Sequence, residues 1–173
     1  MGQVVFITGG TRSGKSSYAQ QRAEEHKGAL LYIAPAEVDD DEMLQRVRMH
    51  QEARGERWQL LEEPLWLADR LAEPAANKGA LLLDCVTLWI SNLFFHFEEK
   101  SAPVLGEVDR FLGLISQLEE PLYLVSNELG SGIVPENRMA RQFRDLAGIV
   151  NQRIAATADE AWLVVAGLPV QLK

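Results

Sequence analysis

The sequence predicts an α/β fold in which a mostly parallel sheet is flanked by helices. Short apolar runs typical of buried strands alternate with longer helical segments, which is the pattern of parallel strands joined by helical crossovers. The 173 residues match the length of one domain, and no internal repeat, low-complexity segment or linker divides them. We therefore expect residues 1–173 to form a single domain.

The predicted strands are short runs rich in valine, isoleucine and leucine. They fall at residues 3–8, 30–34, 58–61, 80–86, 122–125 and 161–165, with a possible edge strand at 169–172. Helices are expected at 16–27, 42–54, 65–71, 104–118 and 136–158, with Pro135 in the first turn of the last one. Residues 73–79 are expected to form a surface loop, and residues 87–97 either a buried helix or a subunit interface.

Composition narrows the class of protein. The formal net charge of −8 disfavours general nucleic-acid binding, because no basic excess is available to neutralise phosphates. The apolar runs fall short of the ~20 residues that a membrane span needs, and no secretory signal is visible, so a cytoplasmic protein is expected. The single cysteine, Cys85, excludes an internal disulfide.

A glycine-rich phosphate loop follows the first predicted strand. The pattern G-x-x-x-x-G-K-[ST] is met by the residues Gly9, Gly10, Thr11, Arg12, Ser13, Gly14, Lys15 and Ser16. The glycines let backbone N–H groups curl around phosphate oxygens, and the helix that follows adds the favourable field of its N-terminus. Lys15 is expected to reach the β- and γ-phosphates, and the Ser16 hydroxyl to ligate Mg²⁺. The loop therefore predicts binding of a nucleoside triphosphate.

Asp84 ends an apolar predicted strand. A carboxylate there is suited to meet Mg²⁺, directly or through water. The alternative is a helix cap before Thr87. We expect the metal or nucleotide contact, and we expect Cys85 beside it to be a small buried side chain rather than a nucleophile.

Two groups of basic residues recur at helical spacing. Arg46, His50 and Arg54 share one face of the helix expected at 42–54, and by spacing alone a solvated charged face is the default interpretation. Arg138, Arg141 and Arg144 follow a glycine-containing segment at 128–137. They are expected either to close over phosphates as a lid or to form a surface helix with Glu136 and Asp145 as ion-pair partners. His26 and His96 are expected to be structural or surface residues.

The chain resembles the bifunctional adenosylcobinamide kinase / adenosylcobinamide-phosphate guanylyltransferase family of cobalamin biosynthesis. The matching segments are GGTRSGKS at 9–16, YIAPAEVDDDEM at 32–43, DCVTLWISNL at 84–93 and NELGSGIVPENRMARQFRDLAGIVNQ at 127–152. The last segment is long and distinctive, whereas the first alone is generic. The resemblance implies a single P-loop NTPase (RecA-like) domain, a homotrimer, and two reactions that use GTP and ATP as substrates with Mg²⁺.

In the first implied reaction, the γ-phosphate of ATP or GTP passes to adenosylcobinamide. In the second, GTP guanylylates a histidine, which corresponds to His50, and the GMP then passes to adenosylcobinamide phosphate. The implied catalytic residues are His50 and Lys15, and the implied metal ligands are Ser16 and Asp84. Further nucleotide contacts are implied at Ala34, Pro35, Ala36, Gln51, Glu52, Ala53, Arg54, Glu62 and Asp84.

Two other classes of protein share the phosphate loop. A monofunctional small-molecule kinase needs Lys15 and Ser16 but gives His50 no covalent role. A GTPase switch usually recognises guanine with an N-K-x-D loop that follows a strand near the C-terminus. The corresponding residues here are Ser126-Asn127-Glu128-Leu129. The missing lysine and aspartate disfavour the switch.

Overall fold

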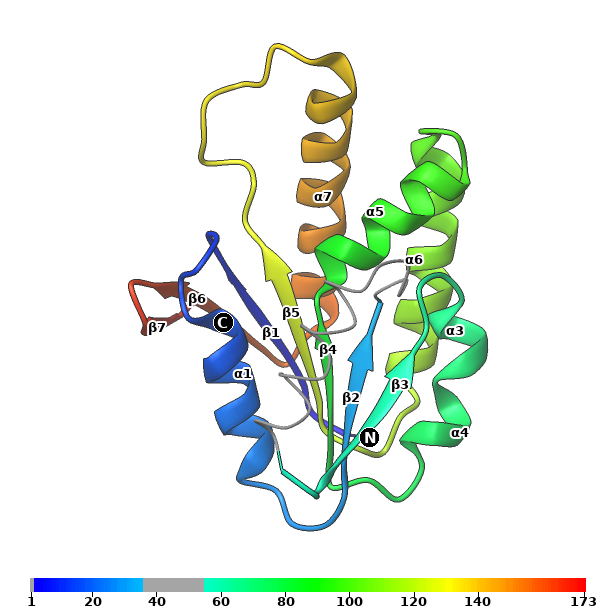
Figure 1. Cartoon of the computed structure of the whole chain (residues 1–173), viewed down its shortest axis with the longest axis vertical. Helices are drawn as coiled ribbons and strands as arrows, with labels where there is room; N and C mark the ends of the chain where they lie inside the picture. The colour runs from blue at the N-terminus through cyan, green and yellow to red at the C-terminus, as the bar shows by residue number, and fades with distance from the viewer. Residues whose placement is uncertain (1, 36–54) are drawn as a thin grey trace.

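The fold is a seven-stranded sheet with helices on both faces (Figure 1). The computed structural model describes residues 2–35 and 55–173, so the helix expected at 42–54 lies outside the described residues. The strand order is β3-β2-β4-β5-β1-β6-β7. The strands are β1 (Val4–Gly9), β2 (Leu30–Ala34), β3 (Trp58–Glu62), β4 (Ala80–Asp84), β5 (Leu122–Asn127), β6 (Glu160–Val165) and β7 (Leu168–Gln171).

All neighbouring strands pair in parallel except β6 and β7, which pair antiparallel. The mostly parallel sheet predicted from the sequence is therefore confirmed, including the short edge strand near the C-terminus. Because the six strands β1 to β6 run in one direction, their carboxyl ends meet at one edge of the sheet. Ligands of open parallel sheets bind beyond that edge.

The helices form two layers. They are α1 (Lys15–Glu24), α3 (Leu67–Arg70), α4 (Ala72–Ala75), α5 (Val86–His96), α6 (Ser101–Ile115) and α7 (Arg138–Thr157). Helix α1 packs on β4 and β5 from one face, over a core that includes Ile7, Leu82 and Val125. Helices α5, α6 and α7 cover the opposite face, over the larger core. Among the described residues, no helix is both long and apolar enough to cross a membrane.

The apolar segment at 87–97 belongs to the core. Helix α5 buries Trp89, Ile90, Leu93 and Phe94, and among its large apolar side chains only Phe95 is largely exposed, at 57%. Burying several large apolar side chains on one helix contributes roughly 1.5–3 kcal/mol for each of them. The core alternative predicted for this segment is thus confirmed in this chain.

Two local predictions were wrong. Pro135 does not lie in the first turn of α7, because the helix begins at Arg138 and the side chain of Asn137 caps it by accepting a hydrogen bond from the Ala140 N–H at 3.1 Å. An asparagine at the N-cap satisfies an otherwise unpaired backbone donor, and this sets the start of the helix. The loop expected at 73–79 is helical in its first part, because α4 extends to Ala75, whereas the short helix expected near 65–71 is confirmed as α3.

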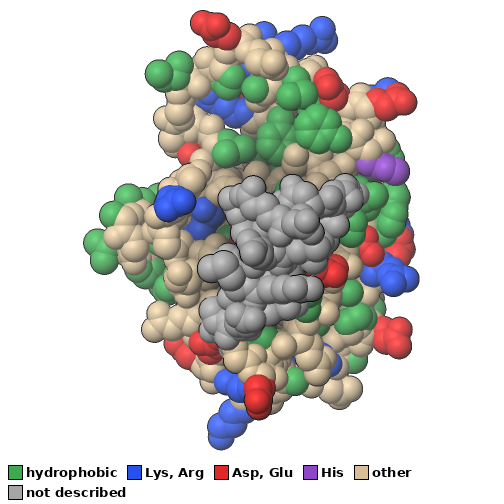
Figure 2. All heavy atoms as spheres, in the orientation of Figure 1, with side chains coloured by type: hydrophobic (Ala, Val, Ile, Leu, Met, Phe, Trp, Pro, Cys, Tyr) green, Lys and Arg blue, Asp and Glu red, His purple; other side chains and the backbone are tan. Residues whose placement is uncertain are grey.

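The β6–β7 hairpin projects from the sheet and carries exposed apolar side chains. Its two-residue turn, Ala166-Gly167, has φ angles of 52° and 80°, as a type I′ turn requires. Figure 2 shows hydrophobic side chains on this projection, and Leu168 and Val170 are 70% and 51% exposed. The hairpin is important for the site because its turn touches the phosphate loop.

Candidate phosphate-binding site

The predicted phosphate loop connects β1 directly to α1. Gly9 is the last residue of β1, and Gly14 is the N-cap of α1. The backbone turns back on itself in between: Arg12 and Gly14 have φ angles of 57° and 95°, and the Ser13 N–H donates to the Gly10 carbonyl at 3.2 Å. Such a turn directs successive backbone N–H groups toward one point, which suits an anion.

Gly9 has no space for a side chain. A Cβ placed there would lie 2.4 Å from the Val164 carbonyl oxygen and 2.6 Å from Ser13 Oγ. The crowding arises because β1 is central: Gly9 pairs with Asn127 of β5 on one side and with Val164 of β6 on the other. The first glycine of the motif is therefore required by packing as well as by the turn.

The β6–β7 turn braces the loop from outside. The Gly167 N–H donates to the Ser13 carbonyl at 2.8 Å. A Cβ on Gly14 would lie 3.2 Å from the Gly167 Cα, so the two glycines approach closely. Sequence reasoning missed this contact. The Ala166-Gly167 pair signals a hairpin turn, but nothing local says which loop the turn meets.

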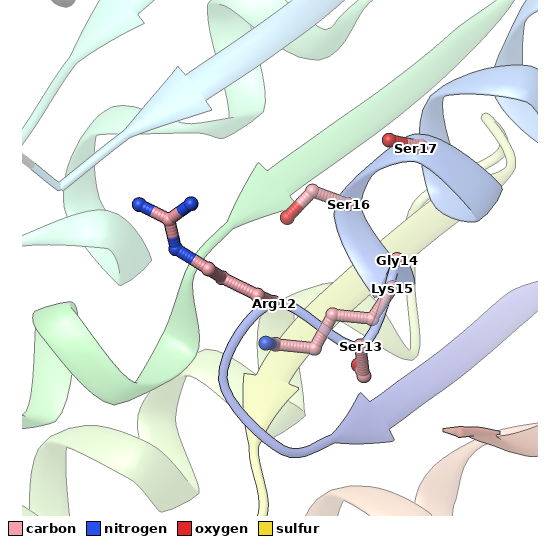
Figure 3. Close-up of a pocket in the computed structure, with 6 residues that line it drawn as sticks. All are labelled: Arg12, Ser13, Gly14, Lys15, Ser16 and Ser17. Carbon is pink, nitrogen blue, oxygen red and sulfur yellow. The ribbon is translucent and has the colours of Figure 1, made fainter. Parts of the chain in front are cut away.

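A cavity of about 270 Å³ lies over the loop. It is lined by Arg12, Ser13, Gly14, Lys15, Ser16 and Ser17, of which Ser17 was not among the predicted residues. Figure 3 shows the Lys15 ammonium lying within the curve of the loop, while the Arg12 side chain extends out of it. Lys15 is 7% exposed, and its ammonium donates to the Gly10 carbonyl at 3.0 Å. A lysine ammonium enclosed by a glycine-rich loop at the start of a helix is suited to bind a polyphosphate.

Asp84 belongs to the same end and face of the sheet. Leu82, two residues earlier, packs in the core under α1, and side chains alternate along a strand, so Asp84 faces the α1 side. Burial raises the pKa of the neighbouring Cys85 thiol, and the charges of both Asp84 and Lys15 act on it. Cys85 is partly buried and its thiol is not activated, which agrees with the expectation that it is not a nucleophile. The N-cap position of α5 is occupied by Cys85 rather than Asp84, so the interpretation of Asp84 as the helix cap is wrong.

Glu62, Ala34 and Pro35 lie farther along the same edge. Ala34 pairs with Glu62 at the carboxyl ends of β2 and β3, and the Asn92 amide of α5 donates to the Pro35 carbonyl at 2.6 Å. In the strand order, β4 and β5 separate these residues from the phosphate loop. The other predicted residues Ala36, Arg46, His50, Gln51, Glu52, Ala53 and Arg54 lie outside the described residues.

Two arginines of α7, Arg141 and Arg144, hold the segment at 128–137, which rises above the sheet between β5 and α7 (Figure 1). Arg141 donates to the Pro135 carbonyl at 2.9 Å, and Arg144 donates to the Gly130 carbonyl at 2.7 Å. Glu128 accepts from Ser131, which with other nearby donors lowers the pKa of the carboxyl group. Within residues 2–35 and 55–173, neither Glu136 nor Asp145 forms an ion pair with these arginines. The prediction that these two carboxylates are their ion-pair partners was therefore wrong. The lid remains a prediction.

The two described histidines are structural, as expected. His26 shares a hydrogen bond of 2.9 Å with the Tyr123 hydroxyl, and His96 packs edge-on against Trp66 and Phe97. Neither ring lines the cavity over the phosphate loop. Neither of these two histidines is therefore placed to act as a nucleophile on a nucleotide in this cavity.

Donors for a divalent cation are also present. The Ser16 hydroxyl lines the cavity, and the Asp84 carboxylate lies at the carboxyl end of β4. Both are hard oxygen donors of the kind that Mg²⁺ prefers. No group of three acidic, histidine or cysteine ligands occurs in the described part of the chain. Mg²⁺ commonly uses one or two protein ligands and takes the others from phosphates and water.

Comparison with known proteins extends the picture to the whole chain. The model of the family described as cobinamide kinase / cobinamide phosphate guanyltransferase matches residues 5–172. The bifunctional adenosylcobalamin biosynthesis protein CobU of Salmonella typhimurium is 38% identical over 98% of this chain and 99% of its own length. CobU of Escherichia coli is 36% identical over the same shares of both chains. The corresponding protein CobP of Pseudomonas aeruginosa is 41% identical over 97% of this chain and 96% of its own length. With a phosphate loop at the edge of a mostly parallel sheet and a match of this extent, the chain belongs to the cobinamide kinase / cobinamide phosphate guanyltransferase family.

Proposed function

We propose that the protein phosphorylates adenosylcobinamide with ATP or GTP, and then transfers GMP from GTP to the product through a GMP-histidine. The final product is adenosyl-GDP-cobinamide. The observation that carries the proposal is the cavity over the phosphate loop, with Lys15 enclosed in it, in a chain that belongs to this family. Family membership supports the choice of substrates, and the loop supports the chemistry.

The kinase step needs the γ-phosphate held in place and its charge offset. The hydroxyl oxygen of adenosylcobinamide attacks the γ-phosphorus, the bond to the β-phosphate oxygen breaks, and the nucleoside diphosphate leaves. The hydroxyl proton passes to solvent. The backbone N–H groups of residues 9–16 and the Lys15 ammonium would bind the charged oxygens as they develop. Ser16 and Asp84 would hold Mg²⁺, which offsets phosphate charge when bound.

The guanylyl transfer needs a nucleophile at the α-phosphorus, and we assign it to His50. A neutral imidazole is a good nucleophile near pH 7, because its unperturbed pKa is about 6.5. Its attack expels pyrophosphate and forms a phosphoramidate. A phosphate oxygen of adenosylcobinamide phosphate then displaces the imidazole, so that one difficult transfer becomes two easier ones. Arg46 and Arg54 lie four residues to either side of His50 in the sequence, and we assign to them stabilisation of the pentavalent centre.

The remaining assignments concern the base and the assembly. Glu62 lies at the carboxyl end of β3, where it pairs with Ala34 of β2. A carboxylate there is suited to accept hydrogen bonds from guanine N1 and N2, and we assign base selection to it. The family resemblance supports a homotrimer, and we expect the enzyme to act in the cytoplasm.

Product analysis tests the proposal. Purified protein is incubated with adenosylcobinamide and Mg²⁺, with ATP alone in one reaction and GTP alone in another, and the corrinoids are separated and identified by mass. We expect adenosylcobinamide phosphate in both reactions and adenosyl-GDP-cobinamide only with GTP. A monofunctional kinase would stop at the phosphate in both, and absence of any phosphorylated corrinoid would overturn the proposal. His50→Ala is the matched variant, and it should stop at the phosphate with GTP as well.

A further inference from the structure

Strand β5 places one side chain between the two parts of the proposed kinase site. β5 lies between β1, which ends in the phosphate loop, and β4, which ends at Asp84 (Figure 1). The register sets Asn127, the last residue of β5, directly beside Gly9, and Val125 beside Asp84. The carboxyl end of β5 is therefore flanked on one side by the loop and on the other by the acidic residue.

The direction of the Asn127 side chain follows from strand alternation. Tyr123 and Val125 pack in the core beneath α1, whereas Leu124 packs in the core on the other face. Ser126 faces that second side, because its hydroxyl donates to Asn151 of α7 at 2.7 Å. Asn127 consequently faces the α1 side, which is also the side of Asp84.

A network of polar side chains fixes the backbone of Asn127. The Asn127 N–H donates to Thr87 Oγ1 at 2.7 Å, and the Asn127 carbonyl accepts from Asn151 Nδ2 at 3.1 Å. Ser126 links the two, since its hydroxyl also lies 3.2 Å from Thr87 Oγ1. Thr87 and Ser126 are 9% and 1% exposed. Buried polar networks are costly unless every member is paired, and this one is paired around a single backbone position.

The next residue ties the position to the phosphate loop. The Glu128 N–H donates to the Gly9 carbonyl at 3.0 Å, so β5 and the start of the loop move together. The carboxamide of Asn127 itself makes no hydrogen bond to any residue in the ranges 2–35 and 55–173. The strand end is held from three sides while its side chain is left available to a ligand.

We propose that the Asn127 carboxamide is a catalytic residue of the kinase step, donating hydrogen bonds to the γ-phosphoryl group during its transfer. Thr87, Ser126 and Asn151 are positioning residues that hold it. The inference rests on the proposed function and names a contact to the transferred group. The amide gives up no proton: the bond from the acceptor oxygen to the γ-phosphorus forms, the bond to the β-phosphate oxygen breaks, and the amide donors follow the oxygens of the moving group. Donors aimed at developing charge in this way stabilise the transition state more than the bound substrate.

Two substitutions at Asn127 test the contact. Asn127→Ala removes the donors, and Asn127→Asp replaces them by a carboxylate of the same size, which would repel the phosphoryl oxygens. We expect kcat for adenosylcobinamide phosphorylation to fall about 10²-fold in the alanine variant and at least as far in the aspartate variant. The Kd for nucleotide, measured by equilibrium binding without corrinoid, should change only a few-fold in Asn127→Ala. Asn77→Gly, at an exposed turn with a φ of 62°, is the control and should keep the wild-type kcat.

The positioning residues have a separate readout. Thr87→Val keeps the volume but removes the acceptor for the Asn127 N–H, whereas Thr87→Ser retains it. We expect kcat to fall about tenfold in the valine variant and to recover in the serine variant, with KM little changed in both. Thermal unfolding of every variant shows whether the fold is kept. If Asn127→Ala is unstable, the kcat of Asn127→Asp tests the contact in its place.

The outcomes separate this inference from the proposed function. If wild type forms adenosylcobinamide phosphate and both Asn127 variants keep its kcat, the inference is wrong and the function stands. If Asn127→Ala loses only nucleotide affinity, the residue binds the ground state and the catalytic role is also wrong. If wild type forms no phosphorylated corrinoid, the proposed function fails, and the assignment of Asn127 fails with it.

Discussion

Of the two glycines that open the phosphate loop, only Gly9 should be destabilised by substitution with alanine. Gly9→Ala places a Cβ 2.4 Å from the Val164 carbonyl oxygen and 2.6 Å from Ser13 Oγ, whereas Gly10→Ala places it in open space, with nothing within 4 Å. Ser13 can adjust at small cost because a side-chain atom is involved. Val164 cannot, because its carbonyl belongs to a strand that pairs with β1 at this residue.

The magnitude follows from the overlap. Ordinary contact begins near 3.4 Å, so the backbone of β1 or β6 must move by about 1 Å. Forcing extra volume into a packed position costs typically ~1–3 kcal/mol. For a chain of this size, each kcal/mol lowers the melting temperature by roughly 2–4 °C, which predicts a fall of roughly 2–12 °C for Gly9→Ala. Gly10→Ala should stay within ~0.5 kcal/mol of wild type, as exposed substitutions usually do.

Differential scanning calorimetry of the two variants beside wild type measures this contrast directly. Nucleotide binding should also weaken in Gly9→Ala, because moving Gly9 displaces the turn that begins the loop. Equal melting temperatures for Gly9→Ala and Gly10→Ala would refute the packing explanation of the first glycine.

Other predictions concern charge. Lys15→Ala should slow both transfers by about 10³-fold or more, measured as initial rates at saturating substrates, because it removes the cation that offsets phosphate charge. Ser16→Ala should raise the Mg²⁺ concentration for half-maximal rate by about tenfold, seen in a metal titration of the kinase reaction. Glu160→Gln should destabilise the fold by about 1 kcal/mol near pH 7, because hydrogen bonds from Trp162 and then Arg22 lower the pKa of Glu160 below its ordinary value of 4.5. A lowered carboxyl pKa stabilises the fold above the unfolded pKa and ceases to do so as pH falls through the folded one, so urea unfolding of wild type and Glu160→Gln should converge in acid.

The parts of the fold that depend on local sequence pattern were predicted correctly. The run at 30–34 is a strand with the bounds expected from its apolar residues, and the loop at 9–16 connects a strand to a helix as the motif requires. The start of α7 was missed because a cap competes with Pro135: the Asn137 side chain pairs the free N–H of Ala140, which outweighs the proline's preference for a first turn.

Other features could not be predicted from local sequence, because they are contacts between segments that lie far apart in the chain. The contact of Gly167 with Ser13 depends on β6 pairing with β1, and the place of Asn127 beside Gly9 depends on β5 being inserted between β1 and β4. No periodicity or spacing near either residue contains the strand order. His50 stays a prediction from the resemblance, since it lies outside the described residues.

The central claim is that His50 attacks the α-phosphorus of a GTP whose phosphates are bound by the phosphate loop. The most direct measurement incubates the protein and Mg²⁺ with GTP radiolabelled at either the α- or the γ-phosphate, without corrinoid, and follows label bound to denatured protein. The account predicts acid-labile label from the α-phosphate only, lost in both His50→Ala and Lys15→Ala. Label from the γ-phosphate, no α-label on wild type, or undiminished α-label on His50→Ala would contradict it.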